Sequence, residues 1–377
     1  MTTNYEMIGR EDINDLEAIL SISNSDVDEI VHTVRAESDA LFTWDYSRSR
    51  PALIKLYEKA KTSQWNATTD LDWSLPVDQA EQVLANAQAN VNGPFSGGLD
   101  LKGTPFESWT DDQWIQLGIE GQNWTLSQFL HGEQGALICT AQIVETVPWI
   151  DAKYYAATQV MDEARHVEVF ARYLNEKLSG HYPINAHLKM LLDDIIMDTR
   201  WDMTYLGMQI MVEGLALAAF GFIHQLTTEP LLKKLLRYVM SDEARHVAFG
   251  VLSLQELYDG MTQAELRERQ EFAYEAVLRL RDRWFHTDTW QRLGVDPRPL
   301  VRVMIDEQSD EERMFRTMLF SKIVPNCKKL GLLDAGDGWL RQKFGELGIL
   351  VFEDWVDTGD EYEDLVEVSK DRDAASA

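Results

Sequence analysis

Apolar residues recur at helical spacing through the middle of the chain, and a polar residue interrupts each stripe. The first stripe comprises Ile119, Gln122, Leu126, Phe129, Glu133, Leu137, Thr140 and Val144, and the second comprises Leu206, Ile210, Glu213, Leu217 and Phe220. Residues three and four positions apart share one face of a helix, so both segments are predicted to be helices with a buried side. A carboxylate stands in mid-stripe in each, Glu133 in the first and Glu213 in the second.

An internal repeat relates these two segments. The sequence Asp-Glu-Ala-Arg-His-Val occurs at 162–167 and again at 242–247, and Glu133 precedes the first copy by the same interval as Glu213 precedes the second. In each copy the Glu and the His are three residues apart, so they share one helix face. The repeat thus singles out six residues, namely Glu133, Glu163, His166, Glu213, Glu243 and His246.

Each half of the repeat has a turn at its midpoint, at Pro148 in the first and at Thr228 in the second. Each half is therefore predicted to be an antiparallel helical hairpin. The two acidic residues of a half lie about 15 residues on either side of the turn, roughly 22 Å along the axis, so they reach the same level. The predicted helices cover 111–146, 150–179, 201–227 and 230–258, and together they form a four-helix bundle.

Four carboxylates and two imidazoles directed into one core need neutralisation, because desolvating an isolated carboxylate is prohibitive. Two divalent cations would balance the four carboxylates, and mixed oxygen and nitrogen ligands suit iron or manganese. Magnesium and calcium sites do not need two histidines. Zinc would fit without providing redox chemistry. The alternative from the residues alone is a structural helical protein whose buried polar groups share protons and hold no metal.

The spacing resembles the signature of the ferritin-like di-iron carboxylate proteins, twice over, across about residues 120–250. This superfamily includes multicomponent monooxygenase hydroxylases, acyl-carrier-protein desaturases, the ribonucleotide reductase small subunit, rubrerythrins and arylamine N-oxygenases. The resemblance implies a bundle that binds two iron ions, or manganese or a mixed pair, and reacts with O₂ or peroxide. It implies that Glu133, Glu163 and His166 hold mostly one ion, that Glu213, Glu243 and His246 hold mostly the other, and that Glu163 and Glu243 bridge them.

The remaining charged residues of the repeat are assigned to the surroundings of the metals by the same resemblance. Asp162 and Asp242 are expected to accept the ring N–H of the ligand histidine in the opposite half, which fixes the tautomer. Arg165 and Arg245 are expected to pair with these aspartates. The competing interpretation is an exposed ion pair within one helix turn.

At several positions the sequence differs from the patterns of particular members of this superfamily, and these differences limit which subfamily it resembles. Phe170 stands where the reductase subunit would carry its radical tyrosine, and Leu217 stands where the multicomponent hydroxylases place a threonine. Arylamine N-oxygenases add a seventh ligand, a histidine one turn before the fourth glutamate, and here Val239 occupies that position, with Gln159 at its equivalent in the first half. This difference counts against assignment to the arylamine N-oxygenases.

An apolar substrate pocket is expected beside the metals, because a dry cavity prevents side reactions of the oxidant. The candidate lining residues are Leu137, Thr140, Phe170, Gln209, Leu217 and Phe220. Ordinary core packing is the competing interpretation for each. His131 and Cys139 lie on the first ligand helix but have no counterpart in the other half, so they are expected not to be ligands.

The charge and the cysteine count indicate which binding partners and which cellular compartment to expect. The 63 acidic residues outnumber the 35 basic ones, for a net charge of −28, which disfavours nucleic acid and anionic membranes. Two cysteines and no signal peptide indicate the cytoplasm. The stretch 206–226 is apolar enough to suggest a membrane span, but Glu213 in its middle favours a core helix of a soluble protein.

We expect an all-α, ferritin-like four-helix bundle with helical N- and C-terminal extensions, organised as a single domain over 1–377. An N-terminal extension, 1–105, contains helical patches at 11–36 and 51–62 and a loop at 90–98. The bundle covers 106–260, C-terminal helices lie within 261–352 at 262–284, 298–330 and 338–352, and a solvated acidic tail covers 353–377.

The expected function is that of an O₂-activating di-iron oxidoreductase acting on a small apolar organic substrate. It would be a mono-oxygenase, by C- or N-oxidation, or a desaturase or oxidase. The chain has no glycine-rich nucleotide fingerprint, so a separate ferredoxin or reductase would supply electrons. A homodimer is a family-level expectation. The alternative function is a non-catalytic metal- or ligand-binding protein or a peroxide scavenger.

Overall fold

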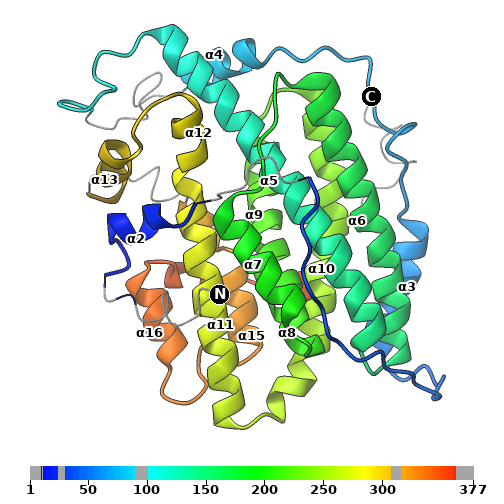
Figure 1. Ribbon diagram of the computed structural model, residues 1–377. Helices are drawn as coiled ribbons and strands as arrows, with labels where there is room; N and C mark the ends of the chain where they lie inside the picture. Colours follow the sequence, from blue (N-terminus) through cyan, green and yellow to red (C-terminus); the bar gives the residue numbers. More distant parts are fainter. Residues whose placement is uncertain (1–9, 11, 24–29, 90–100, 307–315, 362–377) are drawn as a thin grey trace.

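The computed structural model describes residues 10, 12–23, 30–89, 101–306 and 316–361, and within these ranges the regular secondary structure is helical (Figure 1). Four long helical segments run side by side and enclose the centre of the molecule. They are α5 (Asp111–Thr146), α6 (Ile150–Lys177), the continuous run of α8 (Trp201–Tyr205), η1 (Leu206–Val212) and α9 (Glu213–Leu226), and α10 (Pro230–Asp259). The predicted all-α four-helix bundle is confirmed, with boundaries within two residues of those expected.

The local sequence accounts for the ends of these helices. The backbone N–H of Thr110 donates to Gln113 Oε1 at 3.0 Å at the start of α5, in a capping box. Pro230 stands in the first turn of α10, where a missing N–H does not matter, and Glu229 caps that helix through its carboxylate. Each hairpin turns where a short extended connection follows the preceding helix.

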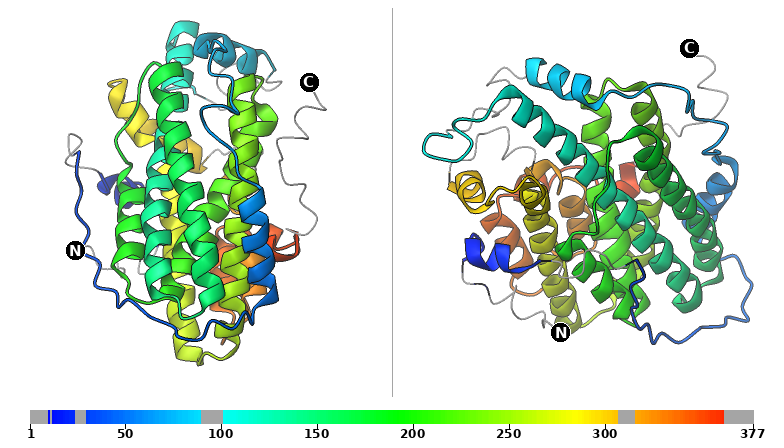
Figure 2. Two further views of the ribbon diagram at one scale, coloured as in Figure 1. Left: turned by 90° about the vertical axis from the view of Figure 1, so that its right-hand side faces the viewer. Right: turned by 45° about the horizontal axis from the view of Figure 1, so that its top comes forward.

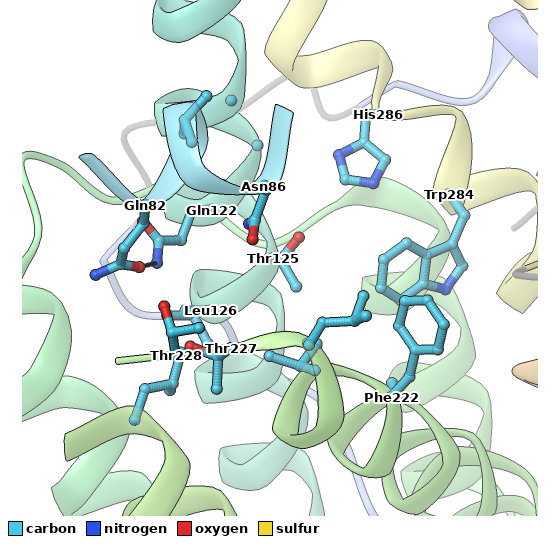
Figure 3. Close-up of a pocket in the computed structure, with 17 residues that line it drawn as sticks. Gln82, Asn86, Gln122, Thr125, Leu126, Phe222, Thr227, Thr228, Trp284 and His286 are labelled. Atoms are coloured by element: carbon cyan, nitrogen blue, oxygen red, sulfur yellow. Dashed lines mark hydrogen bonds between the residues drawn. The ribbon is translucent and has the colours of Figure 1, made fainter. Parts of the chain in front are cut away.

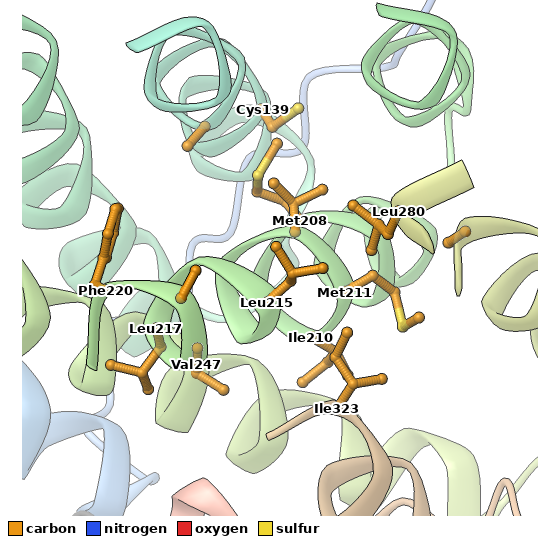
Figure 4. Close-up of a cluster of buried hydrophobic side chains, with 14 of the residues drawn as sticks. Cys139, Met208, Ile210, Met211, Leu215, Leu217, Phe220, Val247, Leu280 and Ile323 are labelled. Atoms are coloured by element: carbon orange, nitrogen blue, oxygen red, sulfur yellow. The ribbon is translucent and has the colours of Figure 1, made fainter. Parts of the chain in front are cut away.

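The third bundle helix is the apolar one. Trp201–Leu226 is long enough to cross a membrane and its most apolar window has a mean hydropathy of 1.7, but 72% of that window is buried inside the protein. Met208, Ile210, Met211 and Leu215 pack with Cys139 and Val247 of neighbouring helices (Figure 4). Its burial favours the predicted core helix over a membrane span. The segment Leu206–Val212 is π-helical, directly before Glu213.

Further helices cover the bundle on several sides (Figure 2). α3 (Pro51–Thr62) packs on α6 and α10. On the other side, α7 (Ala186–Met197) packs against α5 and η1, and α11 (Gln263–Asp282) packs against η1 and α7. The remaining elements are α2 (Leu16–Ser21), α4 (Gln79–Ala89), η2 (Arg283–Phe285), α12 (Thr287–Arg292), α13 (Arg298–Asp306), α15 (Ile323–Lys329), α16 (Trp339–Glu346), η3 (Leu350–Phe352) and α17 (Thr358–Glu361).

The flanking predictions need correction. Helix in 11–36 is limited to α2 within the described residues, and residues 31–50 run extended along the bundle, anchored where Ser49 N and Arg50 N donate to Asp151. The expected helix 298–330 is interrupted, since the described part between α13 and α15 contains turns, and 338–352 is broken at Gly348, whose φ is 72°. The beginning of the acidic tail is packed rather than solvated, because Thr358 is buried against Asn326. The predicted loop 90–98 and the tail beyond 361 lie outside the described residues.

Gly250 lets two ligand-bearing helices approach closely, which gives a first prediction. A Cβ at this position of α10 would lie 2.6 Å from Gln209 Cβ on η1, an atom that cannot rotate away. We expect Gly250→Ala to lower the free energy of unfolding by about 1–3 kcal/mol and to reduce the metal content of purified protein. Gly121→Ala on α5, where a Cβ meets nothing within 4 Å, is the control and should stabilise by about 0.5–1 kcal/mol. Thermal unfolding checks both, and an unchanged melting temperature for Gly250→Ala would contradict the close approach.

Candidate metal centre

Each of the four bundle helices brings one glutamate to the same level of the core. Glu133 comes from α5, Glu163 from α6 and Glu243 from α10, while Glu213 begins α9 directly after the π-helical segment. The most exposed of the four, Glu133, has only 5% of its surface accessible. The duplicated halves therefore converge on one buried cluster of acids.

Two buried imidazoles face these carboxylates through their Nδ1 atoms. His166 Nδ1 lies 3.1 Å from Glu133 Oε2, 3.1 Å from Glu243 Oε1 and 3.5 Å from Glu163 Oε2. His246 Nδ1 lies 3.1 Å from Glu163 Oε1 and 3.6 Å from Glu243 Oε2. The two rings are 5.9 Å apart, centroid to centroid. Glu163 and Glu243 thus lie beside both histidines.

The unpaired polar atoms of the cluster test whether metals fit there. Within the described chain, Glu163 Oε2, Glu213 Oε2, both oxygens of Glu243 and His246 Nδ1 are buried without a hydrogen-bond partner. Such groups are costly unless a cation satisfies them. Two ligands at right angles on one ion, each about 2.1 Å from it, are about 3 Å apart, which matches the 3.1 Å separations between Nδ1 and carboxylate oxygen.

The geometry divides these atoms into two overlapping groups. Potential ligand atoms within 4.8 Å of one another come from Glu133, Glu163, His166 and Glu243 in one group, and from Glu163, Glu213 and His246 in the other. All are buried. The cluster therefore fits a dinuclear metal site with carboxylate and imidazole ligands, as the donor set of iron or manganese requires.

The Nε2 atom of each histidine, on the side of the ring away from the glutamates, lies near the aspartate of the other repeat copy. His166 Nε2 lies 3.2 Å from Asp242 Oδ2, and His246 Nε2 lies 3.4 Å from Asp162 Oδ2. Because a carboxylate only accepts, Nε2 carries a proton in each ring, which leaves Nδ1 as the nitrogen that can bind a metal. Burial alone would raise the pKa of Asp242, but the charges of Arg245 and His166 outweigh it and hold this pKa below its ordinary value.

The two arginines of the repeat are buried among these aspartates rather than exposed. Arg165 Nη2 donates to Asp162 Oδ1 at 2.5 Å and to Asp242 Oδ2 at 2.9 Å, while Arg245 Nη2 donates to Asp242 Oδ1. Neither guanidinium exposes more than 6% of its side chain. The alternative of a solvent-exposed pair within one helix turn does not describe this arrangement.

The N-terminal extension supplies partners that the sequence pattern did not single out. After α3 the chain crosses the bundle, and Trp65 Nε1 donates to Asp242 Oδ2 at 2.7 Å. Gln64 Nε2 donates to Asp162 Oδ1 at 3.2 Å and Gln64 Oε1 accepts from Arg165 Nη1 at 2.8 Å. The two residues stand about a hundred positions before the first repeat copy, so the repeat gives no indication of them.

Charges within the metal-free cluster shift its titration strongly. Burial and the neighbouring Glu243 raise the pKa of Glu133 to about 8. Burial and Glu163 raise the pKa of Glu213. Burial would lower the pKa of His166 and of His246, but Glu133 and Glu163 respectively outweigh it and raise both above the ordinary value. The folded protein thus binds protons where it would otherwise bind cations.

The seventh-ligand position behaves differently in the two halves. Val239 is fully buried and carries no ligand atom. Gln159, its counterpart, donates from Nε2 to Glu163 Oε1 at 2.9 Å and to Glu213 Oε1 at 3.0 Å. The amide of Gln159 therefore orients the carboxylates of Glu163 and Glu213. It does so from the first-half equivalent of the seventh-ligand position.

The six predicted pocket residues pack in the core. Rings of Phe129, Phe170 and Phe220 contact one another, Thr140 and Gln209 are buried, Leu217 is 7% exposed and Leu137 is half-buried. None of the six lines either of two cavities near this level of the bundle, so their role in substrate binding stays a prediction. His131 Nε2 lies 2.8 Å from the Tyr182 carbonyl oxygen, and neither it nor Cys139 belongs to the metal-binding groups.

The smaller of these cavities, about 20 Å³, adjoins the metal ligands. Its lining includes Gln128, Phe129, Gly132, Glu133, Ala136, Leu188, Val212, Glu213, Ala216, Glu243 and Arg283. The larger, about 320 Å³, lies further along the same helices. Gln82, Asn86 and Gln122 form one side of it, and Phe222, Trp284 and His286 form the other (Figure 3).

Comparison with known proteins identifies a family. The family model described as P-aminobenzoate N-oxygenase AurF matches residues 47–331. A search of curated proteins found no significant match. Among solved structures, an R2-like ligand-binding oxidase with aerobically reconstituted Mn/Fe cofactor (long soak) is 19% identical, over 76% of this chain and 94% of its own, with a TM-score of 0.47. The same oxidase after photoconversion is 18% identical, over 74% and 92%, with a TM-score of 0.47.

Proposed function

This chain belongs to the P-aminobenzoate N-oxygenase AurF family, and from that membership we propose that it is a di-iron N-oxygenase that oxidises the amino group of a small aromatic amine. The family makes it a di-iron oxidase or oxygenase, and the choice of reaction and substrate is ours. The expectation that the missing histidine argues against this family is corrected, because the family match extends across both Glu163 and Val239.

One observation carries the proposal, which is the convergence of four buried carboxylates and two imidazoles. Among the described residues, Glu163 Oε2, Glu213 Oε2, both oxygens of Glu243 and His246 Nδ1 have no hydrogen-bond partner. We assign Glu133 and His166 to one iron, Glu213 and His246 to the other, and Glu163 and Glu243 to both. Bound iron would supply activation of O₂. With Val239 in place of a histidine, the second iron would have one nitrogen ligand fewer than the seven-ligand pattern provides.

The surrounding residues hold this centre in place and keep water out. Asp242 and Asp162 fix the Nε2–H tautomers, so that Nδ1 of each histidine is available as a ligand. Gln159 fixes the orientation of Glu163 and Glu213. The contacting rings of Phe129, Phe170 and Phe220 exclude solvent beside the cluster, which protects a reactive oxidant from side reactions.

Electrons must come from elsewhere, because forming a hydroxylamine from an amine and O₂, with release of water, consumes two electrons and two protons. We propose a separate ferredoxin or reductase as the donor and a homodimer as the assembly. The two buried cysteines form no disulfide, which supports a reducing compartment, the cytoplasm. We propose no nucleic-acid or membrane partner, in keeping with the net charge of −28.

A single-turnover experiment tests the reaction. Iron-loaded protein is reduced chemically without oxygen, mixed with 4-aminobenzoate and O₂, and its products are identified by mass spectrometry. We expect the hydroxylamino or nitro product, with O₂ uptake that depends on substrate. Peroxide consumption without oxidation of any amine would favour the scavenger instead, and iron loading far above two per chain would favour storage.

A further inference from the structure

Positive charge gathers around one helix of this strongly acidic protein. Residues 48–62, which lead into α3 and form it, contain a single acid, Glu58. The same stretch has five basic residues, namely Arg48, Arg50, Lys55, Lys59 and Lys61. Over the whole chain the acids outnumber the basic residues by 63 to 35, so this stretch has the opposite charge balance from the rest of the protein.

The first part of α10 extends this excess of positive charge. Residues 230–241 contain Lys233, Lys234 and Arg237 and no acid. α3 packs on α6 and α10 at the outside of the bundle, and the left-hand view of Figure 2 faces this side, with α3 in blue. We call the surface formed by six of these side chains the basic face, and its members are Lys55, Lys59, Lys61, Lys233, Lys234 and Arg237.

Contacts just after α3 join the two parts of the basic face. Trp65 follows α3 and stacks on Tyr238 of α10, with 5.0 Å between the ring centroids. Lys234 Nζ lies 5.8 Å from the centre of the Tyr238 ring. Two members of the face are half-buried, and the exposed ones are Lys55, Lys61, Lys234 and Arg237. The face therefore presents several cations to solvent around Trp65.

Ion pairs with nearby acids do not neutralise the basic face. Asp151 and Glu256 pair with the two arginines before α3, which are not members of the face. Within the face, Lys61 pairs with Glu58 at 2.7 Å, and about half of each side chain is exposed. With Glu58 counted against its six cations, the face keeps a net positive charge.

The basic face lies close to the metal ligands. The Trp65 ring is 6.4 Å from the ring of His166, centroid to centroid, and Trp65 Nε1 donates to Asp242, which also contacts His166. Only 6% of Trp65 is exposed. One indole ring therefore separates a protein seated on the basic face from a ligand of the assigned metal centre.

We propose that the basic face binds an acidic one-electron carrier protein, of the ferredoxin or flavodoxin type, and that electrons enter the protein there. This inference rests on the proposed function for the need of electrons. Each reduced carrier gives up one electron, which converts one Fe³⁺ to Fe²⁺, and leaves in its oxidised form. Two carriers therefore bind in turn for each amine oxidised. Electron-transfer complexes are small, with less than about 1,200 Å² buried in total, so one helix and its surroundings suffice.

The net charge of −28 does not prevent this docking. Charges are screened over about 8 Å at physiological ionic strength, so a docked partner interacts with the local cations more than with distant acids. Nucleic acid fits the face less well, because a duplex carries one charge per about 1.7 Å and continues beyond α3, whose twelve residues span about 18 Å. A compact acidic protein can cover the face without contacting the acidic surface beyond it.

The test measures association and electron transfer, and not amine oxidation. Iron-loaded protein is mixed with an acidic [2Fe–2S] ferredoxin at low and at physiological ionic strength. Calorimetry gives the affinity for the oxidised ferredoxin, and stopped-flow absorbance gives the rate at which the reduced ferredoxin is reoxidised. We expect the double variant Lys55→Glu/Lys234→Glu to lower both by about tenfold or more at low ionic strength, and by less as salt is added.

Two further variants and one assay serve as controls. Arg302→Glu reverses an exposed charge on α13, far from α3 in Figure 1, and should change either quantity by less than about twofold. Lys55→Gln/Lys234→Gln removes the two charges without reversing them, so its effect should lie between those of wild type and the Glu variant. Single-turnover amine oxidation by the chemically reduced Glu variant should equal that of wild type, because the variant leaves the metal centre intact.

Each outcome decides the proposal. Equal affinity and rate in wild type and the Glu variant, or tighter binding of cytochrome c, a basic carrier, than of the ferredoxin, would overturn it. Binding of a short DNA duplex that the Glu variant abolishes, without binding of ferredoxin, would also overturn it. Reoxidation of ferredoxin without amine oxidation would sustain the docking face and refute the reaction. Amine oxidation by chemically reduced protein that binds no ferredoxin would do the reverse.

Discussion

Glu163→Ala protein is expected to retain neither metal ion through desalting, whereas Glu213→Ala is expected to retain about one of two. The difference follows from geometry, because Glu163 contributes an oxygen to both groups of ligand atoms and Glu213 to one of them. Elemental analysis after iron loading gives the metal content directly. Amine oxidation should fall to background in both variants, since the reaction needs the pair.

A matched control separates this effect from misfolding. Glu168→Ala removes an exposed glutamate from the same helix, α6, and should keep both metals. Metal-free Glu213→Ala loses one member of a crowded, buried acidic cluster, so its unfolding temperature should not fall below that of metal-free wild type. Metal-free Glu163→Ala loses the countercharge of His246 and should unfold at a lower temperature. Two tightly bound metals in folded Glu163→Ala would refute the ligand assignment.

The bundle and the positions of its six central residues could be predicted because the information is local and duplicated. Periodic apolar stripes define long helices, and the equal spacing from Glu133 to Glu163 and from Glu213 to Glu243 places the acids at one level. The extended course of residues 31–50 could not be found this way, since its conformation depends on packing against the bundle and not on a periodic pattern of its own. Helix α7 does have an apolar stripe at helical spacing, so the sequence was sufficient to predict it; the stripe comprises Leu188, Leu191, Leu192, Ile195 and Ile196.

Of the residues that surround the six central ones, only those within the repeat could be predicted. Asp162 and Asp242 belong to the repeat, so their crosswise contacts with the histidines could be anticipated. Trp65, Gln64 and Arg283 come from segments far from the repeat in sequence, and only the fold brings them near. Val239 does not exclude the chain from the family, because one ligand position is a smaller part of a family's pattern than the sequence that builds the bundle.

Metal affinity should increase steeply with pH between about 6 and 8, by about tenfold per pH unit for each proton that the metals displace. Glu133, with a pKa raised to about 8, and the raised pKa values of Glu213, His166 and His246 mean that the metal-free site holds protons in this range. Anaerobic titration with Mn²⁺, in buffers of different ionisation enthalpy, measures both the affinity and the number of protons released.

The metal-free protein should show the opposite dependence. A group whose folded-state pKa lies above its unfolded value holds a proton that the unfolded chain has lost, so stability declines as pH rises between the two values, by about 1.4 kcal/mol per pH unit for each group. For Glu133 that window extends from its ordinary pKa of 4.5 to the raised pKa of about 8. Thermal unfolding should thus shift downward with pH without metal and upward with it.

Glu133→Gln provides the control for the pH dependence of metal affinity and of metal-free stability. Glutamine has nearly the same shape as glutamate and cannot titrate. The slope of metal affinity against pH should decrease by about one proton, and the metal-free variant should lose less stability than wild type between pH 6 and about 8. Affinity that does not change with pH in wild type would mean that Glu133 and Glu213 are already ionised without metal. Burial beside other acids raises the pKa of both groups, so ionising both in the metal-free folded chain is too costly.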